Sequence, residues 1–340
     1  MDKQSLVERL VPYLESLYPD RSSVSVTNLD EINMGWETEL YTFEVDSIKN
    51  GDQIIEHRVL RVFQGDSAER KSAKEYYLMS KLDDVGYPVP RVYSHELSGE
   101  TIGKPFILME RILGKTLDDT YRNETPEELQ KGLSRLIGLF VRLHQLDITP
   151  FKRIPELPFR DDHIQDYLDW YGRSVQEQLS WMKPVVDWLR ERKPYIDPVP
   201  QSLLHMDYHG MNVMLREDDS EAVIDWGASS IGDYRMDLGW TMLLYTTFGG
   251  DMFRDPILAE YTEHNGRMVK DIEYFEVMAT ARRIIDFAMT MEGDVSSVGL
   301  KSEVVEMMKK SKDHYQRVHD VLTARTSIRL KIFSEALDSL

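Results

Sequence analysis

The sequence of 340 residues contains no cysteine, which excludes disulfides, thiolate metal sites, iron–sulfur clusters and cysteine nucleophiles. It is also poor in basic residues: 41 lysines and arginines stand against 59 aspartates and glutamates, so the formal net charge is −18. A chain this acidic repels phosphate backbones, and we expect no nucleic-acid partner. A local basic pocket for a small phosphate compound is still compatible with this charge.

Long hydrophobic runs are missing as well. The longest uncharged apolar stretch, 238–250, is too short to span a bilayer and is predicted to be a buried helix. The first ten residues mix acidic, basic and apolar side chains, a pattern that does not predict a secretory signal. We therefore expect a soluble cytoplasmic protein without a membrane partner, and the sequence leaves its oligomeric state open.

The chain is about twice the usual domain length, which favours two domains or one large two-lobed unit. Up to Met109 the apolar segments are short, alternating and rich in β-branched residues. This part predicts strands at 24–26, 40–45, 58–63 and 106–109, and one helix at 67–82. After Glu110 the pattern is mostly helical, with long helices predicted at 161–192, 272–291 and 302–336. We expect an α+β protein with a β-rich N-terminal lobe, 1–109, and a mainly helical C-terminal lobe, 110–340.

The most informative segment combines two short apolar strands with polar residues at their ends. The segments 213–215 and 222–224 are joined by a polar loop, which predicts a β-hairpin. Asn212 precedes the first strand and Asp225 follows the second, so both lie at the same end of an antiparallel pair. Asp207 lies on the loop that leads into that end. Carboxylate and amide oxygens gathered in this way suit Mg²⁺ better than softer metals.

The spacing of His205, Asp207 and Asn212 matches the catalytic loop of kinases, and 225–227 (Asp-Trp-Gly) stands where Asp-Phe-Gly is found. The longer string His-Met-Asp-Tyr-His-Gly-Met-Asn, 205–212, resembles the aminoglycoside phosphotransferase family, which includes choline, homoserine and fructosamine kinases. That family usually reads His-Gly-Asp-Leu-His-Pro-Gly-Asn. The departures keep every polar position and lie at Met206, Tyr208, Gly210 and Met211.

The resemblance implies a two-lobed, protein-kinase-like fold whose N-terminal lobe binds the nucleotide. It implies transfer of a phosphoryl group from ATP or GTP, with Mg²⁺, to a hydroxyl of an aminoglycoside-, sugar- or amino-alcohol-like small molecule. In this reading Asp207 orients or deprotonates the acceptor hydroxyl, and Asn212 and Asp225 hold the metal. His205 and Asp237 are expected to support the site structurally.

In the first lobe the sequence predicts a buried cation beside a buried carboxylate. Arg61 shares a strand face with apolar residues, and Glu75 lies on the apolar stripe of the following helix. A charged side chain on an apolar face needs a partner, so Arg61 and Glu75 are predicted to pair. Such a pair could have a purely structural role, and Arg61 could also be a solvated residue of an edge strand. The resemblance implies that Arg61 replaces the usual lysine at the nucleotide phosphates, as in the family's leucine-arginine variants.

The resemblance also implies other nucleotide and acceptor contacts. Gly35 would lie in the loop that covers the phosphates, and the backbone of Glu110 to Ile112 would bind the adenine edge. His209 is open between loop support and acceptor contact. Acids and aromatics of the insert 159–193, among them Asp161 and Trp170, could bind a cationic acceptor or form the two faces of an amphipathic helix.

Three other functions stay open. A pseudokinase or nucleotide-binding scaffold would keep the fold without turnover. A metal-dependent hydrolase would use His205, Asp207 and His209 as a metal cluster. A protein-serine/threonine kinase is disfavoured, because only a few residues separate Gly227 from Gly232, too few for an activation loop.

Overall fold

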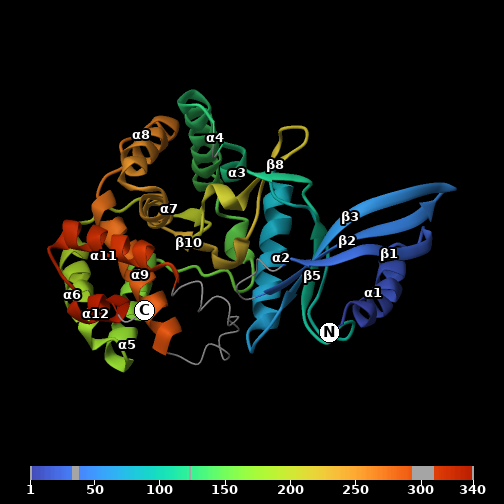
Figure 1. The fold of residues 1–340 in the computed structure, drawn as a ribbon, viewed down its shortest axis with the longest axis horizontal. Helices are drawn as coiled ribbons and strands as arrows, with labels where there is room; N and C mark the ends of the chain where they lie inside the picture. The colour runs from blue at the N-terminus through green and yellow to red at the C-terminus, as the bar shows by residue number, and fades with distance from the viewer. Residues whose placement is uncertain (1, 33–37, 122–123, 293–309, 339–340) are drawn as a thin grey trace.

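The computed structural model describes residues 2–32, 38–121, 124–292 and 310–338. A β-rich N-terminal part lies beside a larger, mainly helical part, so the predicted two-lobed α+β fold is confirmed (Figure 1). The predicted division after Met109 falls one residue before the end of the last strand of the N-terminal sheet and stays a prediction.

The N-terminal lobe is built on one five-stranded antiparallel sheet, in the order β1-β2-β3-β5-β4. Its strands are β1 (Ser22–Ile32), β2 (Thr38–Lys49), β3 (Asp52–Phe63), β4 (Val92–Glu96) and β5 (Phe106–Glu110). Helix α1 (Lys3–Leu17) buries Leu6, Leu10 and Leu14, which recur every four residues and so lie on one face. This face packs with apolar side chains of the sheet, among them Phe43 and Phe106.

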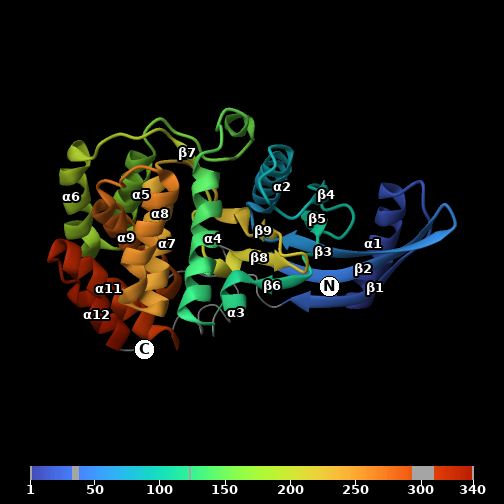
Figure 2. The same ribbon diagram turned by 90° about the horizontal axis from the view of Figure 1, so that it is seen from above.

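Helix α2 (Ala68–Asp84) lies between the sheet and the helical part of the chain (Figures 1 and 2). It buries Leu78, Met79 and Leu82 in the large core of the C-terminal part. Ala68, at the start of the helix, packs instead with Phe63 of the sheet. The helix therefore contacts both parts of the chain, which places Glu75 between them.

The C-terminal part contains helices, three strands next to the predicted motif and two further short strands. The helices are α3 (Leu117–Tyr121), α4 (Pro126–His144), α5 (His163–Glu177), α6 (Lys183–Arg192), α7 (Tyr234–Gly249), α8 (Arg254–Asn265), α9 (Ile272–Glu292), α11 (Lys312–Thr326) and α12 (Lys331–Asp338). The strands are β6 (Gly114–Thr116), β7 (Ser202–Leu204), β8 (Val213–Arg216), β9 (Glu221–Val223) and β10 (Ser230–Gly232). They form a three-stranded sheet, β6-β8-β9, and a two-stranded sheet, β10-β7.

Two of the predicted long helices are wrong in extent. The stretch predicted as one helix at 161–192 is divided into α5 and α6, because a 3-10 turn intervenes and Pro184 can stand only in the first turn of the second helix. The described part of 302–336 contains α11 and α12, and α11 ends at Thr326, because the left-handed φ of 62° at Ser327 stops the helix. The helix predicted at 272–291 is confirmed as α9.

The uncharged stretch at 238–250 forms most of α7, which packs against α9 and is buried along nearly its whole length. This accounts for its composition, since a helix that is covered all round needs no polar face. Among the described helices, none combines the length and apolarity that a bilayer crossing requires.

Candidate active site

The predicted hairpin is present and brings its polar ends together. Strands β8 and β9 pair antiparallel with Val213 opposite Val223, and the amide of Ile224 donates to the carbonyl of Asn212 at 2.9 Å. Asp225 follows directly, in the left-handed conformation with φ 64°. Asn212 and Asp225 are therefore neighbours at one end of the hairpin, as the sequence predicted.

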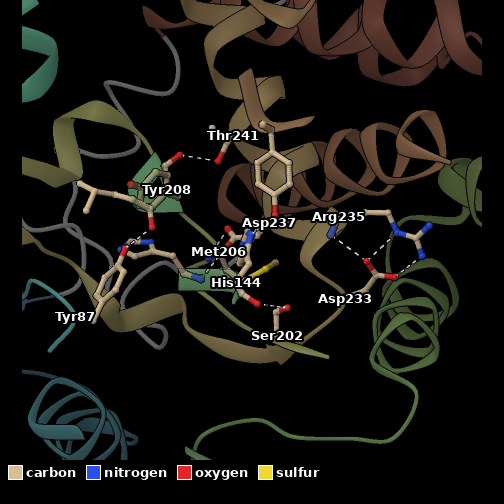
Figure 3. A network of polar contacts seen from close by, with 12 residues as sticks. Tyr87, His144, Ser202, Met206, Tyr208, Asp233, Arg235, Asp237 and Thr241 are labelled. Carbon is tan, nitrogen blue, oxygen red and sulfur yellow. Dashed lines mark hydrogen bonds and ion pairs between the residues drawn. The ribbon is translucent and has the colours of Figure 1, made fainter. Parts of the chain in front are cut away.

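The segment 205–212, called the Asp207 loop below, is held by a buried carboxylate on α7. Asp237 is fully buried and accepts the backbone N–H of His205 at 2.6 Å and that of Met206 at 2.8 Å. His144 on α4 lies 3.2 Å from the same carboxylate (Figure 3). The ring of His205 in turn bonds the carbonyl of Ile224, at 2.9 Å. These bonds join the loop to the hairpin and to two helices.

Asp207 is oriented by neighbours on both of its oxygens. The indole N–H of Trp240 donates to Oδ1 at 3.0 Å, and Nε2 of His209 lies 3.8 Å from Oδ2. Burial by itself raises the pKa of Asp207, but His209 and the Trp240 bond outweigh it and hold this pKa well below its usual range. Because 37% of the side chain is exposed, this ionised carboxylate can reach a ligand.

The oxygens at the hairpin end fit a divalent cation. The side-chain nitrogen of Asn212 donates to the carbonyl of Asp207 at 3.0 Å, which turns it towards the loop. In the described part of the chain, the amide oxygen of Asn212 and Oδ2 of Asp225 accept no hydrogen bond. Two available hard oxygen donors at one hairpin end suit Mg²⁺. Where the chain is described, no three His, Asp or Glu side chains group as a metal cluster. The ring of His205, one of the three residues of the hydrolase alternative, bonds the carbonyl of Ile224 instead.

The predicted pair in the first lobe forms and extends to the hairpin. Arg61 on β3 lies 3.1 Å from Glu75 on α2 and donates to Oδ1 of Asp225 at 2.9 Å. Glu75 is 1% exposed, and burial raises its pKa, with Arg61 opposing and Asp225 adding to the shift. One guanidinium therefore links both parts of the chain.

Lys74 makes a second link from α2 that the sequence gave no reason to expect. Its ammonium donates to the carbonyl of Gly227, in the Asp-Trp-Gly segment, and lies 3.4 Å from that of Ser229. Because Glu75 is the next residue, one turn of α2 contacts both Arg61 and the backbone that follows Asp225.

The expected adenine-binding backbone is partly engaged. The amide of Glu110 donates to the carbonyl of Arg91 at 2.8 Å, and that of Arg111 to the carbonyl of His57 at 3.3 Å. The amide of Ile112 has no backbone partner in the described part of the chain. The side chain of Glu110 accepts Arg216 of β8 on both oxygens, at 2.9 and 2.8 Å, and so fastens the hairpin to this connection.

The remaining residues predicted to contact nucleotide or acceptor make no described contact with the Asp207 loop. Gly35 lies outside the described residues. Asp161 is exposed just before α5, and Trp170 packs beside Tyr167 and Tyr171 within the same helix. In the described part of the chain neither side chain hydrogen-bonds to the Asp207 loop. Trp240, which does contact Asp207, was missed, because it lies 33 residues away and carries no motif.

Among curated proteins, the chain is similar to acyl-CoA dehydrogenase family member 11 of Pongo abelii, with 23% identity over 178 residues. The match covers 51% of this chain and 23% of that protein, so the chain spans less than a quarter of the relative's length.

Solved structures show the same fold over nearly the whole chain. A Ralstonia eutropha JMP134 protein, provisionally described as an aminoglycoside phosphotransferase, has a TM-score of 0.69 at 17% identity, covering 93% of this chain and 98% of its own. A thermostable variant of aminoglycoside phosphotransferase APH(4)-Ia, in complex with ADP and hygromycin B, has a TM-score of 0.59 at 14% identity and covers 92% and 97%. Plasmodium vivax ethanolamine kinase has a TM-score of 0.59 at 14% identity and covers 92% and 83%.

A family model also matches the sequence itself, from residue 29 to residue 269. This span takes in the Arg61–Glu75 pair, the Asp207 loop, the hairpin and α7. The chain belongs to the phosphotransferase enzyme family.

Proposed function

We propose that this protein transfers the terminal phosphoryl group of ATP or GTP, with Mg²⁺, to a hydroxyl of a small molecule. One observation carries the proposal: Asp207, Asn212 and Asp225 meet at one hairpin end, and Arg61 reaches Asp225 from the other lobe. The family supports a phosphotransferase, and the similarity to an enzyme solved with ADP supports nucleotide use.

Each residue has one task in this proposal. Asn212 and Asp225 hold the metal through their available oxygens, and bound Mg²⁺ supplies charge neutralisation for the phosphates. Arg61 binds phosphate oxygens through its fork, fixed in place by Glu75. The amide of Ile112 is the backbone donor available to the base.

Asp207 orients the acceptor hydroxyl. The hydroxyl oxygen forms a bond to the terminal phosphorus while the bond to the bridging oxygen breaks, so that the nucleoside diphosphate leaves, and the hydroxyl proton passes to Asp207. The low pKa of Asp207 makes it a weak base before the reaction. Its main contribution is therefore positioning, with proton uptake late in the transfer, as expected for a loose phosphoryl-transfer transition state.

The test combines two variants with a screen. Asp207→Asn should leave folding and binding of a fluorescent ADP analogue nearly intact and lower kcat by at least about 100-fold. Asp225→Ala should abolish the Mg²⁺ dependence of nucleotide binding, read out by magnesium titration. Wild-type turnover in the first variant, or an unchanged titration in the second, would sink the respective role.

The acceptor class is found by measuring nucleotide consumption over aminoglycosides, sugars, choline, amino alcohols and nucleosides, with ATP and with GTP. Asp313→Asn serves as a matched control, because it removes an exposed carboxylate on α11. If nucleotide and Mg²⁺ bind but no acceptor of any class is consumed, the scaffold reading replaces the enzyme.

A further inference from the structure

Arg282 on α9 lies against the Asp207 loop. Its Nη1 donates to the carbonyl of Met206, the residue before Asp207, at 3.0 Å. Its guanidinium also stacks on the ring of Trp240, 3.9 Å from the centroid. Trp240 is the residue whose indole N–H holds Asp207. The backbone and the ring therefore fix this cation beside the proposed position of the acceptor hydroxyl.

Within the described residues, the rest of the Arg282 fork has no full partner. The nearest described carboxylate oxygen is Oδ2 of Asp286, 3.7 Å from Nε, too long for a hydrogen bond. Its Nη2 has no hydrogen-bond partner within the described chain, and 19% of the side chain is exposed. A guanidinium held in place with donors to spare is a binding group for carboxylate or phosphate.

The charges around Arg282 are of both signs: the carboxylates of Asp207 and Asp286 act on it, and Arg283 adds a second cation near Asp286. Arg283 is the next residue of α9, and its Nε donates to His314 rather than to a carboxylate. Both arginines act to lower the pKa of Asp286, but burial outweighs them and raises this pKa. An ammonium group that approached Asp286 would meet two guanidinium groups. On α5, Tyr167 lies within the field of Arg282 and Asp286, and its hydroxyl has no hydrogen bond in the described part of the chain.

We infer that the acceptor is an alcohol that also carries an anionic group, carboxylate or phosphate, and that Arg282 binds this group while the hydroxyl lies at Asp207. The inference rests on the proposed function and narrows its substrate class. It differs from the cationic acceptor that the acids of the insert could bind, and two of those acids already have partners. Asp162 pairs with Lys193, and Asp169 accepts Gln165.

The experiment measures nucleotide consumption with matched acceptors. One arm is a ladder of hydroxy acids of increasing chain length, a second is glycerol 3-phosphate and related phosphate esters, and a third is the neutral amide of each hydroxy acid. Choline and kanamycin form the cationic arm. Turnover in the first arm or in the second identifies the anion as carboxylate or phosphate.

The variants then test the role of Arg282. Arg282→Gln should raise the KM of the anionic acceptor by roughly 10- to 100-fold, the loss expected for hydrogen bonds to a charged group, with the nucleotide KM unchanged. Arg282→Gln should have little effect on the KM of the matched neutral amide. The KM of the anionic acceptor in Arg282→Lys should lie between those of the wild type and Arg282→Gln, since lysine keeps the charge and loses the fork. Arg317→Gln is the control, because Arg317 likewise donates to a backbone carbonyl, but to that of Thr247 on α7 rather than to the Asp207 loop.

Three outcomes would overturn the inference. The first is turnover of cationic or neutral acceptors only, which leaves the phosphotransferase intact. The second is no turnover in either anionic arm. The third is an equal loss of kcat on every acceptor in Arg282→Gln with KM unchanged, which would make Arg282 a brace for the loop alone. Failure of the proposed function is a separate result. It would appear as an absence of Mg²⁺-dependent nucleotide binding in the wild-type protein, or as equal turnover in the wild type and in Asp207→Asn.

Discussion

The bonds around Asp237 allow one perturbation to be worked out in free energy. Asp237→Asn changes a fully buried carboxylate that accepts the N–H groups of His205 and Met206. An amide offers one oxygen, so it can still accept one of the two N–H groups and presents its own NH₂ to the other. The second N–H then has no acceptor in a buried environment.

The expected cost follows from these two bonds. A buried donor left unpaired costs about 1–3 kcal/mol, and a hydrogen bond that loses its charged acceptor weakens by about 1 kcal/mol. Asp237→Asn should therefore lower the free energy of unfolding by about 3 kcal/mol, a large share of the usual 5–15 kcal/mol. Since the displaced backbone adjoins Asp207, kcat should fall by at least about tenfold even where the variant is folded.

The assay is urea unfolding followed by circular dichroism, with kcat measured below the transition. Asp313→Asn is the matched control, because Asp313 also lies in the first turn of a helix but is exposed. Both variants lose a favourable interaction with a helix N-terminus, about 0.5 kcal/mol at an exposed site. Their difference therefore reports mainly the buried contacts of Asp237, the two backbone bonds and His144. If the two variants lose equal stability, Asp237 does not hold the loop as described.

Three further predictions concern the surroundings of the site. Lys74→Met should raise the nucleotide KM roughly 3- to 10-fold and leave the acceptor KM unchanged, because Lys74 holds the backbone after Asp225; Lys74→Arg should restore the nucleotide KM. Equal changes in both KM values would contradict this positioning role. Glu110→Gln weakens a partly exposed pair with Arg216 and should lower unfolding stability by about 1 kcal/mol in urea; no change would show that the pair contributes nothing. Burial, with Arg283 and Arg317, lowers the pKa of His314 from its ordinary 6.5 to about 3. Between these two pH values His314 is protonated in the unfolded chain and neutral in the folded one. Stability should thus fall as the pH drops below 6.5, by up to about 1.4 kcal/mol per unit, and less steeply in His314→Gln; identical pH profiles would refute the assignment.

Local pattern was enough to predict the hairpin, the position of Asn212 and Asp225 at one end of it, and the buried Arg61–Glu75 pair. Strand alternation and helical spacing are properties of neighbouring residues, so they can be read without knowing what packs against them. The error at 161–192 has another cause. Apolar spacing continues through Pro184, but this proline can stand only in the first turn of a helix, so it marks the start of a second helix after the 3-10 turn.

The sequence by itself determined the fold class, the family resemblance and the candidates Asp207, Asn212 and Asp225, since these depend on composition and short spacing. Only the tertiary structure showed what surrounds them. Trp240 and Arg282 come from helices 33 and 75 residues beyond Asp207. Their contacts arise because α7 and α9 pack together behind the loop, and no local pattern encodes that packing. The charges beside the proposed acceptor position were therefore readable only in the folded chain.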